Sequence, residues 1–338
     1  MRIAIYGAGS LGTILGALLS AHYPGVELIT RNADHVHALN LEGARIVGTL
    51  KGTYRVRALL PAQMEGTYDV VFLLTKQQDN AQVARQLKSY LSPTGVLCTM
   101  QNGLPEAQLQ RILGPSKVLG CAIGWGASLI APGVVEMTSG RDTFVFNLGL
   151  PPSGSRESLD RVAAILSTVG TVVTESDFLG ARWSKLVVNA SFSGMSTVLG
   201  GSFKEVIDDR VARRYAQCIV KECIDVAKAL HITLAPIQGK DIVRLFDYHT
   251  RWKRWISFHL IPIALGKHRQ LRPSMLADLE RGRVSEVDAI QGAVARHGRE
   301  VGVKTPVTDR VIDIIHEIER GEAVAGHHNL ARFAEVCH

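Results

Sequence analysis

A lysine, an asparagine and a serine recur at a regular spacing in one apolar segment of the C-terminal half. Lys185, Asn189 and Ser193 stand at i, i+4 and i+8, which places all three on one face of a helix. A lysine in apolar surroundings loses hydration, which lowers its pKa and suits it to proton transfer. A lone lysine on such a helix would more often extend to solvent. The polar row that Lys185 shares instead favours a functional face.

A glycine-rich turn follows the first apolar stretch of the chain. Its sequence, with the spacing GxGxxG, is Gly7-Ala8-Gly9-Ser10-Leu11-Gly12, and it stands between a predicted strand at 3–6 and a predicted helix at 10–22. In this setting Gly7 permits a tight turn, Gly9 lets the backbone approach a pyrophosphate, and Gly12 lets helix and strand pack closely. The helix N-terminus would present free N–H groups to phosphate. The pattern predicts a dinucleotide-binding turn.

The residue after the second predicted strand indicates which dinucleotide binds. NAD-binding domains usually carry an acidic residue there, which accepts a hydrogen bond from the ribose 2′-hydroxyl. This chain has Thr30-Arg31-Asn32 instead. The Arg31 guanidinium could pair with a 2′-phosphate in bidentate fashion, whereas a carboxylate would repel it. The sequence therefore predicts NADP as the cofactor.

Strand and helix patterns alternate through the first half of the chain. Short apolar runs, typical of strands buried on both faces of a parallel sheet, lie at 3–6, 26–30, 68–74, 96–100 and 118–123. Helical patterns lie between them, and this alternation predicts an α/β fold with a doubly wound parallel sheet, a Rossmann domain. Gly and Pro punctuate a β-rich stretch at 124–150, where we expect antiparallel strands at the edge of that sheet.

After about residue 175 strand signals end and helical periods dominate. Helices are predicted at 177–198, 208–230, 274–281, 285–301 and 306–320. We therefore expect an NADP-binding Rossmann domain over 1–175 and an all-helical domain over 176–338, which binds the substrate and carries the catalytic residues. Ser274 precedes an apolar helical run, so it could cap that helix and share its positive end with an anion.

Composition excludes a disordered or a fibrous chain. The 338 residues are 46% hydrophobic and 20% charged, as in an ordinary globular enzyme, and the net charge of +7 suits anionic partners. A basic segment with two tryptophans, at 251–255, is interpreted as a solvated helix face near an anion site, because no nucleic-acid-binding motif accompanies it. We expect no nucleic-acid partner.

Cysteine usage and hydropathy indicate the compartment. The five cysteines are odd in number and include no CxxC pair, so neither a metal site nor a disulfide framework is expected. The apolar N-terminus is interrupted by three glycines, unlike a signal peptide, and no apolar run is long enough to span a membrane. The sequence predicts a cytoplasmic protein without a membrane partner. A homodimer stays open, because the sequence does not fix the oligomeric state.

Two C-terminal segments resemble signatures of the ketopantoate reductases (2-dehydropantoate 2-reductases). The first is Trp183-Ser184-Lys185-Leu186-Val187-Val188-Asn189, and the second is the stretch 274–288, SMLADLERGRVSEVD. The loops Thr75-Lys76-Gln77 and Gln101-Asn102-Gly103 are similar to the family's loops after the Rossmann strands. The resemblance runs from residue 3 to about residue 320.

The resemblance implies a role for each matching residue. The lysine matching Lys185 acts as general acid, and the glutamate matching Glu286 supports catalysis and substrate binding. The implied substrate-binding residues are Asn102, Asn189, Ser193 and Ser274, the last through the substrate carboxylate. The implied cofactor-binding residues are Gly7, Ala8, Gly9, Ser10, Leu11, Gly12, Arg31, Lys76 and Asn102.

The residues and the resemblance together predict an NADP-dependent oxidoreductase that reduces a 2-oxo acid. The implied substrate is ketopantoate, reduced to pantoate in pantothenate and coenzyme A synthesis. Ser193 and Gln291 depart from asparagines of the family, and the stretch 247–271 is longer than in compact members. A different branched or larger 2-oxo acid therefore stays open. A third hypothesis is a non-catalytic NADP(H)-sensing protein, against which the intact Lys185 argues.

Overall fold

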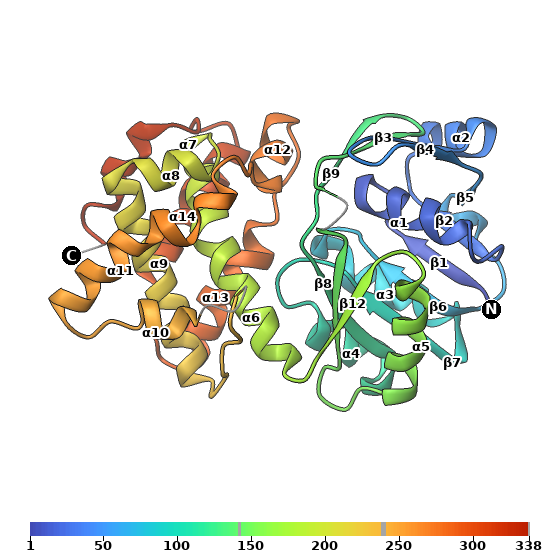
Figure 1. Ribbon diagram of the computed structural model, residues 1–338, viewed down its shortest axis with the longest axis horizontal. Helices are drawn as coiled ribbons and strands as arrows, with labels where there is room; N and C mark the ends of the chain where they lie inside the picture. Colours follow the sequence, from blue (N-terminus) through green and yellow to red (C-terminus); the bar gives the residue numbers. More distant parts are fainter. Residues whose placement is uncertain (141–142, 238–240, 337–338) are drawn as a thin grey trace. The chain divides into compact units, whose positions relative to one another are not determined.

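The computed structural model describes residues 1–140, 143–237 and 241–336, and its contacts divide the chain into two compact units (Figure 1). Unit 1 comprises Met1–Gln101 and Pro105–Phe178, and unit 2 comprises Asn102–Leu104 and Leu179–His338. The main division falls after Phe178. The short segment Asn102–Leu104 was not expected to group with the helical unit.

Within the described part of unit 1, eight strands form one sheet in the order β12-β11-β8-β7-β6-β1-β2-β5. Neighbouring strands from β5 to β8 pair in parallel, which confirms the predicted Rossmann sheet. β11 pairs with β8 in antiparallel fashion. The bounds are β1 Ile3–Tyr6, β2 Val26–Ile29, β5 Arg57–Leu59, β6 Tyr68–Leu73, β7 Leu91–Thr99, β8 Val118–Ile123, β11 Val145–Gly149 and β12 Thr171–Glu175.

Helices cover both faces of this sheet, and β1 shows why its residues are continuously apolar. Ile3 and Ile5 pack into one apolar cluster, with side chains of α1 (Ser10–Ser20) and α5 (Arg156–Ser167). Ala4 and Tyr6 pack into a second cluster, with α3 (Asn80–Lys88) and α4 (Glu106–Leu113). Because alternate residues of a strand point to opposite faces, a strand covered on both sides is apolar at nearly every position.

A smaller sheet of four strands also forms among the described residues of unit 1, in the order β4-β3-β10-β9. The strands are β3 Ala44–Gly48, β4 Gly52–Tyr54, β9 Ala127–Ala131 and β10 Val134–Met137. The prediction of antiparallel edge strands at 124–150 is correct in that β11 joins the main sheet antiparallel to β8, but β12 forms the edge beyond it, and β9 and β10 belong to the smaller sheet. β10 pairs instead with β3, which stands far away in the sequence, and local patterns carry no information on such pairing.

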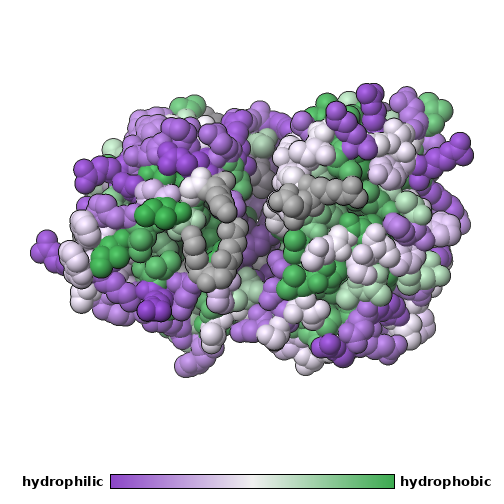
Figure 2. Space-filling model, viewed as in Figure 1, coloured by the Kyte–Doolittle hydropathy of each residue, from purple (hydrophilic) through white to green (hydrophobic). Residues whose placement is uncertain are grey.

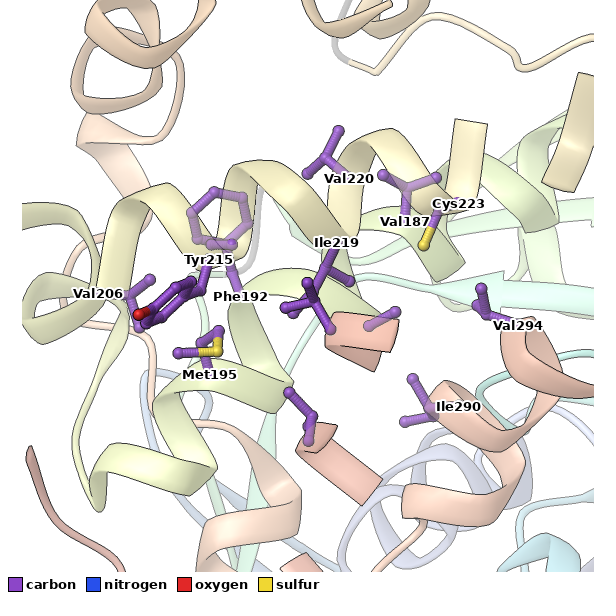
Figure 3. Packing of buried hydrophobic residues seen from close by; sticks show 14 of the residues in the cluster. Val187, Phe192, Met195, Val206, Tyr215, Ile219, Val220, Cys223, Ile290 and Val294 are labelled. Carbon is purple, nitrogen blue, oxygen red and sulfur yellow. The ribbon is translucent and has the colours of Figure 1, made fainter. Parts of the chain in front are cut away.

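Unit 2 is helical, as predicted. Its helices are α6 Phe178–Val188, α7 Gly194–Leu199, α8 Phe203–Asp208, α9 Arg210–Ala229, α10 Ile242–Phe246, α11 Arg251–Ala264, α12 Ser274–Glu280, α13 Val287–Glu300 and α14 Pro306–Glu319. Figure 3 shows part of their shared core, in which Val187, Ile219 and Val294 come from α6, α9 and α13. The predicted helix 208–230 begins later, at Arg210, because the Asp209 side chain caps α9 by accepting from the Val211 and Ala212 amides.

The basic, tryptophan-containing stretch forms α11, which exposes aromatic and apolar side chains. Trp252 and Trp255 are 68% and 53% exposed and stack with their ring centroids 5.2 Å apart. Ile263, further along the helix, is 72% exposed. Figure 2 shows hydrophobic residues, in green, gathered over α11. This face is therefore more apolar than the solvated basic face that the sequence predicts.

The cysteines depart from the predicted pattern at one position. Cys98, Cys121 and Cys223 are free and buried, whereas Cys218 is disulfide-bonded, which the absence of a CxxC pair did not indicate. Cys337 lies outside the described residues. Across 1–140, 143–237 and 241–336, no cluster of three or more His, Cys, Asp or Glu residues could hold a metal ion. In the same ranges no helix has the length and apolar character needed to cross a bilayer.

A carboxylate from one helix binds the first turn of another in unit 2. Glu222 of α9 accepts hydrogen bonds from the Val307 amide at 2.8 Å, the Thr308 amide at 2.9 Å and the Thr308 hydroxyl at 2.6 Å. It thereby satisfies amide groups that α14 leaves without intrahelical partners. Burial raises the pKa of Glu222 from its ordinary 4.5 to about 7, and this outweighs the three donors, which lower it.

We expect this carboxyl group to make stability depend on pH. Between 4.5 and about 7 the folded protein binds more protons at Glu222 than the unfolded chain does. Its contribution to the free energy of unfolding therefore falls as pH rises through that window and levels off above it. Melting temperatures of the wild type and of Glu222→Gln, measured from about pH 5 to about pH 8, should show a steeper fall in the wild type. Parallel curves for the two proteins would contradict this assignment.

Candidate functional site

The glycine loop of unit 1 has the geometry that its sequence predicts at Gly7 and Gly12. Gly7 has a φ of +101°, and a Cβ there would lie 2.5 Å from the Thr75 backbone nitrogen. A Cβ at Gly12 would lie 2.4 Å from the Gly7 carbonyl oxygen. The amides of Gly7 and Ala8 both donate to the Ile29 carbonyl, at 2.9 Å, which fixes the loop across the end of β2. Larger residues at Gly7 or Gly12 would displace this backbone.

Gly9 differs from the other two glycines because it borders open space. A Cβ built at Gly9 would meet no atom within 4 Å. Gly9 is the N-cap of α1, and no side chain caps that helix end. Ser10 and Leu11, the next two residues, begin the helix and are half-buried. An uncapped helix N-terminus beside a residue without a side chain fits the phosphates of a dinucleotide, which need close backbone approach.

A buried histidine supports the glycine loop and was not expected from the sequence. The Gly133 amide donates to His35 Nδ1 at 2.9 Å, so Nδ1 carries no proton, and Nε2 lies 2.9 Å from the Thr13 hydroxyl. Thr13 in turn donates to the Ala8 carbonyl at 3.3 Å. Burial lowers the pKa of His35, which keeps the ring neutral as this network requires. His35 therefore links the loop to the smaller sheet.

Arg31 stands at the end of β2, where the sequence places it, and has a partner that the sequence analysis missed. Its guanidinium Nη2 lies 2.7 Å from Asp79 Oδ2, in the loop after β6. The side chains are 78% and 36% exposed, so the pair is open to solvent. A 2′-phosphate bound to Arg31 would compete with Asp79 for the guanidinium. The negative charge of Asp79 would also repel the phosphate. Asp79 therefore bears on the choice between NADP and NAD.

The loops after β6 and β7, which carry Lys76 and Asn102, are joined by a buried amide. Gln101 Nε2 donates to the Thr75 carbonyl and to Asn80 Oδ1, both at 2.7 Å, and its Oε1 accepts from Thr99 at 3.0 Å. Lys76 directly follows Thr75 and is half-buried, and Asn102 directly follows Gln101. The loop motifs were visible in the sequence, but the role of Gln101 in holding them was not.

The lysine, asparagine and serine of unit 2 lie along one continuous helical path with an irregular turn in it. Lys185 is half-buried on α6, which ends at Val188, and a π-helical turn spans Asn189–Ser193 before α7 begins. The predicted uninterrupted helix 177–198 is wrong in this respect. One turn of an α-helix takes 3.6 residues, so four residues rotate slightly more than one full turn about the helix axis. A π-helix with its i→i+5 bonds is wider, so four of its residues rotate slightly less than one full turn. The π turn therefore brings Ser193 back into line with Lys185.

Ser274 and Glu286 each stand at the beginning of a short or medium helix. Ser274 is the exposed first residue of α12, where Pro273 is the N-cap and no side chain caps the helix, so the expected capping role of Ser274 is wrong. Glu286 is half-buried and is the N-cap residue of α13. Asp288 lies 3.2 Å from His316 on α14 and is therefore engaged elsewhere. α12 contacts α7, and α13 contacts the π turn.

Comparisons with known proteins agree over most of the chain. The family model described as "Ketopantoate reductase PanE/ApbA" matches residues 3–148, and its C-terminal counterpart, "Ketopantoate reductase PanE/ApbA C terminal", matches 177–319. The 2-dehydropantoate 2-reductase of Mesorhizobium japonicum is 27% identical, over 95% of this chain and 99% of its own length.

Solved structures have the same fold. A ternary structure of D-mandelate dehydrogenase with NADH and anilino(oxo)acetate superposes with a TM-score of 0.81 at 23% identity, over 96% of this chain and 100% of that one. A dimeric ketopantoate reductase from Staphylococcus aureus superposes with a TM-score of 0.75 at 18% identity, over 96% of this chain and 100% of that one.

Proposed function

The chain belongs to the ketopantoate reductase family, and is thus an oxidoreductase acting on a CH–OH or C=O group; from this premise we propose that it reduces a 2-oxo acid with NADPH. The substrate that we propose is 2-dehydropantoate, which gives pantoate. The observation that supports the proposal is that Lys185, Asn189 and Ser193 follow one another along a single helical path inside the matched C-terminal segment. We also propose a homodimer, as described for the Staphylococcus aureus relative, and a cytoplasmic location.

The proposed reaction adds a hydride and a proton to the substrate carbonyl. A nicotinamide cofactor held at the glycine loop would supply the hydride that the carbonyl carbon accepts. Lys185, as an ammonium group, stabilises the negative charge that develops on the carbonyl oxygen and transfers a proton to it. The resulting neutral amine then recovers a proton from water. Glu286 either holds the ammonium group or binds a substrate hydroxyl, and both roles fit its half-buried position at the start of α13.

The remaining polar residues would orient the substrate. Ser274 would meet the substrate carboxylate, through its exposed hydroxyl at the start of α12. Asn189 and Glu286 would bind a hydroxyl further along the substrate, which 2-dehydropantoate offers. Ser193 is shorter than the asparagine usual in the family, and this leaves space for a larger 2-oxo acid as a second candidate. The D-mandelate dehydrogenase fold neighbour suggests an aromatic 2-oxo acid as the test compound.

An oxidation assay with a panel of 2-oxo acids tests the proposal. The wild type should oxidise NADPH with 2-dehydropantoate, and kcat/KM should fall about 5- to 150-fold for the analogue that lacks the hydroxyl, since losing one buried polar contact costs about 1–3 kcal/mol. Equal rates with the two compounds would exclude 2-dehydropantoate as the natural substrate. Preference for phenylglyoxylate would favour the larger substrate, and binding of NADPH without turnover of any 2-oxo acid would favour the sensor hypothesis.

A further inference from the structure

Side chains donate to backbone carbonyls within and just before the π turn at Asn189–Ser193. A π turn interrupts the regular i→i+4 pattern, so some carbonyl groups need other donors. Ser191 donates to the Val187 carbonyl at 2.6 Å, and Thr197 donates to the Ser193 carbonyl at 2.7 Å. Both of these donors belong to the same helical path. The third donor, Gln291, comes from α13.

Gln291 reaches the part of the turn on which Asn189 stands. Its Nε2 donates to the Ala190 carbonyl at 3.0 Å and lies 3.5 Å from the Asn189 carbonyl. Both neighbours are carbonyl oxygens, which only accept hydrogen bonds, so the amino end of the amide must face them. Gly194 makes this approach possible, because a Cβ there would lie 2.4 Å from Gln291 Nε2.

Gln291 occupies a position that favours an apolar residue. Its side chain is 0% exposed, and its neighbours Ile290 and Val294 on α13 pack into the apolar core (Figure 3). Within the described residues its Oε1 is buried without a hydrogen-bond partner. A buried amide with one unsatisfied end is unfavourable for folding, and such groups are found where another requirement retains them. Here the requirement is the contact with the π turn, which the hydrogen bonds of Gln291 Nε2 make.

We propose that Gln291 is a positioning residue for substrate recognition, which acts by holding the π turn and with it the orientation of Asn189. The inference rests on the proposed function, in which Asn189 binds a substrate hydroxyl. Without Gln291 Nε2 beside them, the Asn189 and Ala190 carbonyls would no longer be fixed by α13, and the Asn189 side chain would lose its fixed orientation.

The substitution Gln291→Met tests this role, because methionine has similar length and no donor. Discrimination between 2-dehydropantoate and the analogue lacking its hydroxyl should fall about tenfold, mainly through KM for 2-dehydropantoate. kcat with the analogue should change little. The matched control is Gln217→Met, at a glutamine that is 1% exposed and donates to the Arg254 carbonyl of α11 at 2.8 Å instead of to a carbonyl of the turn. The control should lower the melting temperature without changing discrimination.

A double-mutant cycle with Asn189→Ala separates positioning from a general effect. When Asn189 is already alanine, adding Gln291→Met should change discrimination no further, since both act through the same side chain. A second, independent loss of the same size would overturn the proposal. If Gln291→Met does not fold, Gln291→Asn keeps an amide on a shorter stem and should give a smaller loss in the same direction.

Amide hydrogen exchange gives a readout that needs no substrate. Exchange in the segment 189–197 should be faster in Gln291→Met than in the wild type, and unchanged there in Gln217→Met. Unchanged exchange in Gln291→Met would overturn the role in holding the turn. A wild type that reduces no 2-oxo acid would instead reject the proposed function, and the exchange result would still stand. If both Gln→Met variants alter discrimination equally, Gln291 has no specific role.

Discussion

Replacing Lys185 by alanine should lower kcat by about 10²–10⁴-fold, the usual cost of removing a general acid, while NADPH affinity stays nearly unchanged. The proposed hydride transfer places negative charge on the substrate oxygen. Without the lysine, no ammonium group would stabilise that charge or donate a proton to the oxygen. The effect should appear in kcat and kcat/KM together, because the interaction is made in the transition state. Steady-state kinetics measure both quantities, and titration calorimetry measures the dissociation constant for NADPH.

Lys204→Ala is the matched control for this substitution. Lys204 belongs to the same unit, on α8, and forms an exposed pair with Asp208 at 2.8 Å. Removing it should leave kcat within about twofold of the wild type, since exposed pairs contribute little. Near-normal turnover in Lys185→Ala would show that another residue donates the proton. Lys76, half-buried in the loop after β6, would be the next to examine.

Exchanging Arg31→Asp should weaken NADPH binding by about tenfold or more and leave NADH binding much less affected. The substitution removes the guanidinium expected at the 2′-phosphate and adds a second carboxylate beside Asp79. Asp79→Asn should have the opposite effect, because it frees Arg31 from its present partner and removes a repulsive charge. Titration of each variant with NADPH and NADH gives the ratio of the two affinities.

A control for net charge is available in the same unit. Arg156 on α5 is 72% exposed and pairs with Asp160, so Arg156→Asp makes the same change of charge outside the nucleotide loops. Its ratio of NADPH to NADH affinity should equal that of the wild type. If the wild type itself binds the two cofactors equally well, Arg31 does not bind the 2′-phosphate. Its pairing with Asp79 would then be the first cause to test.

Local patterns were enough to predict the Rossmann sheet and the helical unit, because strand and helix periods and the glycine spacing are properties of adjacent residues. They failed where the structure depends on residues far apart in sequence. The spacing of Lys185, Asn189 and Ser193 suits a regular helix. It does not indicate the π turn or the hydrogen bond that Gln291 donates to that turn. The pairing of Arg31 with Asp79 also joins separate loops.

Two further positions illustrate the same limit. His35 looks like an ordinary helix residue in the sequence, yet its ring connects Thr13 and Gly133. Ser274 has the residue type of a helix cap, but Pro273 occupies the N-cap position, and the serine falls one residue inside the helix. Capping depends on which residue ends the preceding extended segment, and helix boundaries inferred from sequence vary by a residue or more.

The four tryptophans are distributed so that the chain carries its own fluorescent reporters. Trp125 in unit 1 and Trp183 in unit 2 are 4% and 1% exposed, whereas Trp252 and Trp255 on α11 are open to water. An aqueous quencher such as iodide would reach the stacked pair and leave the two buried rings bright. Their remaining emission would follow the melting of each unit, and protection of the stacked pair would reveal whatever covers α11.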